Sequence, residues 1–188
     1  SRGLGDVYKR QMNELHLLLQ QNDLGRVSRD NRFNLLSNVI DLCLELTGYL
    51  SGSLSRQPPH YFLKIGRSIE RADMTTRVID VGCLNLMERA PQRGQAEDNI
   101  LWIGVLTSLN AYQMYRQHVQ ERVNGADVAK FLLQNEQFPR SAAHNLTTLT
   151  KVLAKLPNSG KVTWQVNKTR RLVRNADLQG LMQRGVLE

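Results

Sequence analysis

Residues 60–88 form one stretch without proline between Pro58-Pro59 and Pro91, and its apolar side chains recur at intervals of three and four. This spacing is that of an α-helix, and proline does not fit a helix interior, so we expect one helix of about eight turns. The same spacing continues through the rest of the chain, with almost no alternation typical of β-strands. The sequence therefore predicts an all-α fold, a mostly antiparallel helical bundle around a long central helix at residues 60–88.

Two helices are predicted before this segment. The first covers residues 12–22, and the second runs from an N-cap at Asp30 to the region of Gly52 and Ser53. The spacing predicts an inward-facing stripe on the second helix, made of Phe33, Leu36, Ile40, Cys43, Leu44, Leu46 and Leu50.

The remaining helices are predicted from capping and turn residues. After a loop at residues 92–96, Glu97 and Asp98 suit the positive end of a helix dipole, and that helix is expected to run to about Gln120. A short helix follows Gly125, and Pro139 suits the first turn of a helix that ends near Leu156. The last predicted helices lie at residues 166–172 and 177–182.

The length and the cysteines limit the kind of protein further. The 188 residues suit one domain, and no apolar run approaches the about 20 residues that a membrane span needs. Cys43 and Cys83 are far apart and form no CxxC pair, which favours reduced thiols in a cytoplasmic protein over a disulfide framework. Residues 1–11 are interpreted as an assembly scar, because codons for residues 6–11 can spell a sequencing-adapter end, and residues 12–188 are interpreted as a single helical domain.

The net charge of +8 has a local origin. Residues 12–150 carry 14 basic and 14 acidic side chains, whereas residues 151–188 carry eight basic and two acidic ones. The tail patch could bind phosphate, but a solvated helix face is the commoner explanation, and the tail offers one aromatic residue, Trp164. A basic nucleic-acid-binding module is therefore the weakest of the functions considered. The patch consists of Lys168, Arg170, Arg171 and Arg174.

The central helix carries charges beside apolar residues. At about 100° per residue, Glu70 shares a face with Leu63, Met74 and Val81. Asp73 and Arg77 can pair at i,i+4, while Arg67 with Glu70 and Arg77 with Asp80 can pair at i,i+3. A second apolar face holds Phe62, Ile65, Ile69, Ala72, Ile79 and Cys83, and the narrow polar strip between the faces holds Lys64, Ser68, Arg71 and Thr75. We expect other helices to cover these charged side chains, so the charges form either a structural ion network or a cleft that binds a ligand. Because the charges can pair with one another, the structural network is favoured.

The segment 61–77 with the sequence YFLKIGRSIERADMTTR resembles the Glu-Arg signature of the bacterial Alpha-E family of helical domains. Further blocks of the family also have counterparts in this chain, in the family's order. They are residues 12–19 before the signature and residues 102–116, 128–133 and 138–141 after it. Family members begin with another helix that bears a similar motif, so the resemblance implies that this chain is the C-terminal portion of a truncated member.

The resemblance also implies a function. Family members are encoded beside, or fused to, a circularly permuted ATP-grasp protein and often a transglutaminase-like peptidase. The implied role is a non-catalytic accessory or interaction domain that works with an ATP-grasp carboxylate-amine ligase in peptide synthesis or modification. The alternative is a catalytic helical domain that acts on the ligase product through an Arg/Glu cluster.

No known catalytic or metal motif is present. The histidines form neither HExxH nor Glu-x-x-His, and the chain lacks a P-loop, so neither a metal nor a cofactor is expected and no catalytic residue is assigned. Arg140, beside Ser141 in the expected first turn of a helix, could bind an anion or pair with a bundle carboxylate. The candidate binding residues, or members of a structural ion network, are Arg67, Glu70, Arg71, Asp73, Arg77, Arg140 and Ser141.

Overall fold

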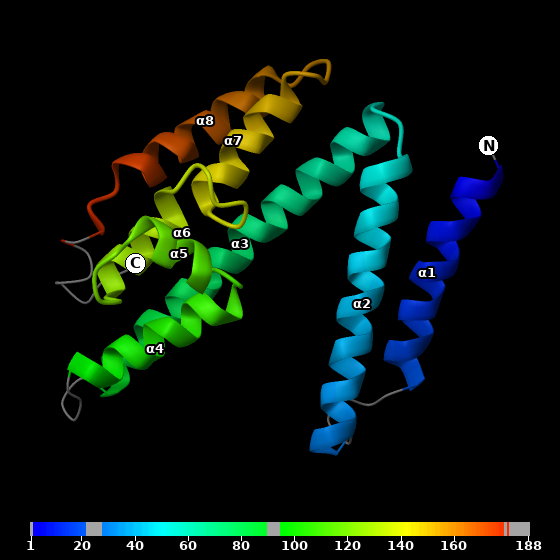
Figure 1. The fold of residues 1–188 in the computed structure, drawn as a ribbon. Coiled ribbons are helices and arrows are strands. Elements are labelled where there is room, and N and C mark those ends of the chain that lie inside the picture. Colours follow the sequence, from blue (N-terminus) through cyan, green and yellow to red (C-terminus); the bar gives the residue numbers. More distant parts are fainter. Residues whose placement is uncertain (1, 22–27, 90–94, 179, 181–188) are drawn as a thin grey trace. The chain divides into compact units, whose positions relative to one another are not determined.

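The structure, a computed structural model, describes residues 2–21, 28–89, 95–178 and 180. The regular elements of this part of the chain are α-helices, so the predicted all-α fold is confirmed (Figure 1). They are α1 (Arg2–Gln21), α2 (Arg29–Ser53), α3 (Pro58–Arg89), α4 (Gln95–Ser108), α5 (Tyr112–His118), α6 (Gly125–Gln134), α7 (Ala142–Leu153) and α8 (Gly160–Asn175). Contacts divide the chain into two compact units, Ser1–Gln57 and Pro58–Glu188.

The first unit consists of α1 packed against α2. The N-cap of α2 is Ser28, whose Oγ accepts a hydrogen bond from the backbone N–H of Asn31 at 3.4 Å. The prediction of Asp30 as the N-cap is therefore wrong, and Asp30 instead places its charge in the first turn, where the helix dipole favours it.

The predicted inward stripe of α2 is wrong for five of its seven residues. Phe33, Leu36, Ile40 and Leu44 are exposed, as is Cys43, whereas Leu35 of the neighbouring face is buried. Leu46 and Leu50, the other two residues of the predicted stripe, are half-buried and lie on the side of Leu35, so the buried face of α2 overlaps the predicted stripe only in these two residues.

In the second unit, α3 confirms the predicted central helix within two residues at its start. Pro58 and Pro59 occupy the first turn, where a backbone N–H has no partner within the helix and a proline is tolerated. The helix contacts α4, α6 and α7, and so it is the element around which this unit assembles.

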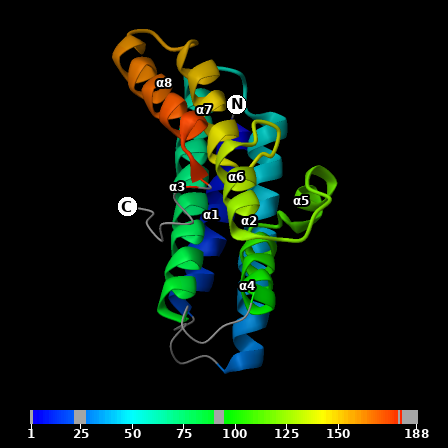
Figure 2. The same ribbon diagram turned by 90° about the vertical axis from the view of Figure 1, so that its left-hand side faces the viewer.

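The helix α7 runs antiparallel to α3. The start of α7 lies near the middle of α3, where Thr75 Oγ1 donates a hydrogen bond to the Arg140 carbonyl at 2.7 Å. The end of α7 lies near the start of α3, where Lys155 Nζ is 5.4 Å from the ring centre of Tyr61. Figure 2 shows α8 beside α7, and the contacts agree.

The core of this unit forms around α4, α5 and α6. Trp102, Leu106 and Tyr115 are fully buried, and Phe131 contacts the Tyr115 ring edge to face at 5.6 Å between centroids. On α3, a Cβ added at Gly82 would lie 3.0 Å from Val105 Cγ2, so the missing side chain lets α4 approach α3 closely.

The predicted single helix from residue 97 to about residue 120 is wrong, because the chain turns between α4 and α5. Asn110 has a φ of 48°, which ends α4 in the left-handed region. The Asn110 N–H donates to the Thr107 carbonyl at 2.9 Å, and the Ala111 N–H donates to the Leu106 carbonyl at 2.7 Å. These two bonds form a Schellman motif, a common helix end in which asparagine is tolerated.

The later helices differ from the prediction mainly at their ends. The helix after Gly125 is confirmed as α6, but α7 begins after an N-cap at Ser141 instead of near Pro139, and it ends at Leu153. The helix predicted at residues 166–172 is part of the longer α8. Of the predicted loop at 92–96, residues 92–94 lie outside the described part, as do residues 179, 181 and 182 of the last predicted helix.

A substitution at the turn between α4 and α5 tests the role of Asn110. We expect Asn110→Ala to lower the free energy of unfolding by about 1 kcal/mol, because a Cβ without a compensating polar group is strained at positive φ. Asn110→Gly should leave the free energy of unfolding unchanged or raise it. Urea unfolding followed by circular dichroism measures both, and Gln113→Ala on the exposed surface of α5 is the control. An unchanged Asn110→Ala variant would contradict this explanation of the helix break.

Candidate functional site

The buried face of α3 lies opposite Glu70 and includes part of the polar strip and part of the second apolar face, on which Ile79 and Cys83 are buried as expected. Ser68 and Thr75 of the polar strip are 4% and 1% exposed. Met74 and Val81, which share the face of Glu70, are 51% and 57% exposed. The expectation that the charges and apolar residues around Glu70 are covered is therefore wrong for the described structure, and of the second apolar face Phe62 and Ile69 are exposed as well.

Helix packing explains why Ser68 and Thr75 of the polar strip are buried, whereas Lys64 and Arg71 of the same strip are exposed. α7 is the helix with which α3 makes its most extensive contact. The facing elements supply small side chains, Ser68 and Thr75 from α3 and Ala142 and Ala143 from α7, and all four are buried. Small side chains let two helix backbones approach closely, which increases dispersion contacts, and a buried hydroxyl is acceptable when it is hydrogen-bonded.

The loop before α7 is held by its own hydrogen bonds. Asn135 Oδ1 accepts from the backbone N–H groups of Gln137 at 2.8 Å and Phe138 at 2.9 Å. Asn145 Nδ2 donates to the carbonyls of Pro139 at 3.1 Å and Ser141 at 2.7 Å. Because these bonds fix the loop on both sides of Arg140, the backbone of Arg140 has a defined position.

Ser141 is a structural residue of this loop. It is fully buried, its Oγ donates to the Asn135 carbonyl, and the same Oγ accepts from the His144 backbone N–H at 3.1 Å. Ser141 is the N-cap of α7, which agrees with the alternative in which this serine helps to cap the helix. Arg140 precedes the cap, so its predicted place inside the first turn is wrong.

The hydrogen bond from Thr75 to the Arg140 carbonyl places Arg140 beside α3, one turn from Arg71 and two turns from Arg67. Burial and the positive charges of Arg67 and Arg140 lower the pKa of Arg71, in that order of importance. We call Arg67, Arg71 and Arg140 the Arg71 cluster. Among the residues that the structure describes, no carboxylate forms a hydrogen bond or an ion pair with the Arg71 or Arg140 side chain, so the predicted alternative in which Arg140 pairs with Glu70 does not occur there.

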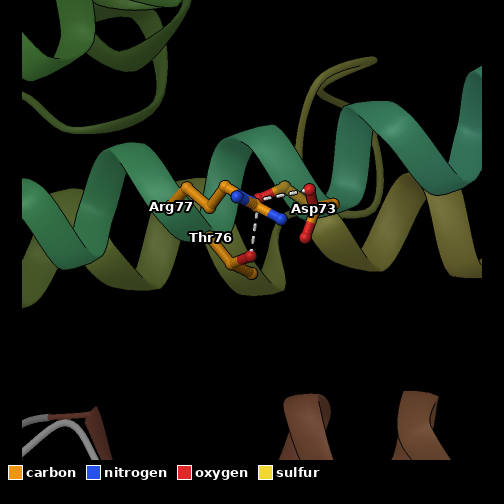
Figure 3. A network of polar contacts seen from close by, with 3 residues as sticks. All are labelled: Asp73, Thr76 and Arg77. Carbon is orange, nitrogen blue, oxygen red and sulfur yellow. Dashed lines mark hydrogen bonds and ion pairs between the residues drawn. The ribbon is translucent and has the colours of Figure 1, made fainter.

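The pair predicted from i,i+4 spacing is present. Arg77 Nε lies 2.8 Å from Asp73 Oδ2, and Thr76 Oγ1 donates to the Asp73 carbonyl at 2.7 Å (Figure 3). Both charged side chains are exposed, so this pair stabilises the helix by a few tenths of a kcal/mol, about the value of such surface pairs. Glu70 is also exposed. The structure thus separates Arg77 and Asp73 from the Arg71 cluster.

Sequence reasoning missed the residues that place Arg140, namely Thr75, Asn135 and Asn145. Asn135 directly follows α6 and could have been read as a turn residue, because asparagine side chains bond to the backbone two or three positions on. The hydrogen bond from Thr75 to Arg140 joins residues that are 65 positions apart, so no local sequence pattern could predict it.

The other reactive side chains do not join the cluster. Burial and the charge of Asp80 raise the pKa of the Cys83 thiol to about 11, which makes it a weak nucleophile. In the described part of the chain, no group of three or more His, Cys, Asp or Glu residues could hold a metal ion.

The basic patch of the tail lies on α8, where Lys168 Nζ is 5.6 Å from the ring centre of Trp164. None of the described helices is both long enough and apolar enough to cross a membrane.

Comparison with known families gives one match over most of the chain. The sequence profile of Alpha-E, described as a predicted alpha-helical domain with a conserved ER motif, matches residues 6–186. Comparison with curated proteins and with solved structures gives no match.

The hydrogen bond between Thr75 and Arg140 can be tested by removing one hydroxyl group. We expect Thr75→Val to lower the free energy of unfolding by about 1 to 2 kcal/mol, because the side chain is buried and the Arg140 carbonyl loses its donor. Thr76→Val is the matched control and should change it by less than about 0.5 kcal/mol, since Thr76 is exposed and bonds within its own helix. Equal effects of the two variants in urea unfolding would contradict the assigned role.

Proposed function

Because the chain belongs to the Alpha-E family of helical domains, we propose that it is a non-catalytic accessory or interaction domain. Its proposed partner is an ATP-grasp carboxylate-amine ligase of the circularly permuted kind, and its proposed process is peptide synthesis or modification. A transglutaminase-like protein is proposed as a further partner. The association of family members with these two enzymes motivates the choice of partners.

The observation that carries the interaction role is the exposed stripe of α3. We call Leu63, Glu70, Met74, Arg77 and Val81 the Glu70 stripe; the five residues are exposed. It combines large apolar side chains with charges on one face of a helix that belongs to the family signature. Contiguous exposed apolar groups rimmed by charged ones are typical of surfaces that contact another protein.

The chemistry of the Arg71 cluster also favours binding over catalysis. A guanidinium group stays protonated near neutral pH, so it donates hydrogen bonds and supplies charge but does not exchange protons as a general acid or base. The catalytic alternative needs a cluster of Glu70, Arg67, Arg77 and Arg140 that acts together, and Arg77 is already paired with Asp73.

Copurification tests the proposed partnership. We expect the tagged chain to retain the ATP-grasp ligase encoded beside it, and Met74→Asp to weaken the complex by about 30-fold, because a charge would be buried in the apolar part of the interface. Leu172→Asp, at an exposed leucine of α8, is the matched control and should bind normally. Undiminished capture by a folded Met74→Asp variant would contradict docking through the Glu70 stripe.

A substitution of Glu70 distinguishes the accessory role from the catalytic one. Glu70→Gln should change the free energy of unfolding by less than about 0.5 kcal/mol, because the carboxylate is exposed, and ligase-dependent product formation should continue. Urea unfolding and the coupled reaction measure the two quantities. Loss of product with unchanged stability and unchanged ligase capture would favour the catalytic alternative.

A further inference from the structure

The fold aligns two arginines of α3 and brings a third beside them. Arg67, Arg71 and Thr75 follow one another at intervals of four, so they form one row along the helix. At the end of this row the Thr75 hydroxyl holds the carbonyl of Arg140 at 2.7 Å. A partly buried hydrogen bond thereby places Arg140, which is 65 positions from Thr75 in the sequence, one helical turn from Arg71.

This arrangement is unfavourable for the protein by itself. Like charges repel, and the repulsion is stronger where the groups are partly removed from water. Arg71 experiences both effects, because burial and its two arginine neighbours act on its pKa in the same direction. Within the described residues, neither Arg71 nor Arg140 has a carboxylate partner, unlike Arg77 on the exposed surface of the same helix.

We propose that Arg71 and Arg140, with Arg67 beside them, form a binding site for an oxyanion, a carboxylate or phosphate group carried by a ligand. The planar guanidinium group donates two parallel hydrogen bonds to such a group, and two guanidinium groups can hold one oxyanion between them. Arg71 is exposed and Arg67 and Arg140 are half-buried, so a ligand can reach them from solvent.

The proposed function suggests which oxyanion is bound. A carboxylate-amine ligase acts on carboxylates, so the carboxylate at the end of a peptide chain is the expected source. This choice of source rests on the proposed function, whereas the oxyanion site itself rests on the Arg71 cluster.

The experiment uses the full chain and four probes. They are acetyl-trialanine with a free carboxylate, its amide, inorganic phosphate, and potassium chloride at matched ionic strength. We expect the free carboxylate or phosphate to raise the melting temperature, and the amide and chloride to leave it unchanged. Isothermal titration calorimetry then gives the dissociation constant of the probe that binds.

Three substitutions locate the site. Arg71→Gln and Arg140→Gln should each weaken binding by about tenfold or more, the effect of losing a charge-assisted hydrogen bond. Arg122→Gln, at an exposed arginine between α5 and α6, removes the same charge and should bind normally. Without any probe, Arg71→Gln should raise the melting temperature by about 1 to 3 °C, because repulsion inside the cluster decreases.

The outcomes separate this inference from the proposed function. Binding of phosphate alone, dependent on Arg71 and Arg140, supports the oxyanion site and overturns the peptide carboxylate as its source. Absence of binding by both anions, or equal weakening by Arg122→Gln, overturns the site even if the ligase is still captured. Oxyanion binding without ligase capture supports the site and contradicts the partnership alone.

Discussion

The packing of α7 on the polar strip of α3 is the interaction on which the second unit depends. It buries Ser68 and Thr75, and it requires a partner for the Thr75 hydroxyl, because a buried hydroxyl without a hydrogen bond is costly. The Arg140 carbonyl is that partner. The packing with α7 therefore sets the rotation of α3, and this hydrogen bond joins α3 to the loop before α7, which the bonds of Asn135 and Asn145 hold. The two features of α3 that bear on the proposals follow from this rotation.

Most helices could be predicted from the sequence, because proline, glycine and apolar spacing act locally. The start of α3 at Pro58 and the start of α6 at Gly125 follow from such signals. The break at Asn110 could not be found by periodicity, since the apolar spacing continues across it and only the positive φ of one residue ends the helix. The presence of asparagine at positions 110 and 135 was the available sequence signal for a turn at these two places.

Which face of a helix is buried could not be predicted reliably. Apolar spacing identifies the residues that share a face, and for Leu63, Met74 and Val81 it did so correctly. Apolar spacing does not indicate whether another helix covers that face. The helix α7 packs on the side of α3 that carries the small residues Ser68 and Thr75, because the two backbones can approach each other closely there. The same limit applies to the site: the pair of Asp73 and Arg77 follows from spacing, whereas the proximity of Arg71 and Arg140 depends on tertiary packing.

The rotation of α3 gives the signature helix two surfaces with different chemistry. Glu70 and Arg71 are adjacent in the sequence, but successive residues of a helix point about 100° apart, so they belong to different faces. Glu70 shares its exposed stripe with Met74 and Val81, while Arg71 lies one turn before Thr75, whose hydroxyl binds the Arg140 carbonyl. A buried ion pair between the two residues of the motif would have made it a structural element. Their separation instead leaves a carboxylate on an apolar surface and a guanidinium group among cations, so the two residues can take part in the two different contacts that we propose, one with a protein and one with an anion.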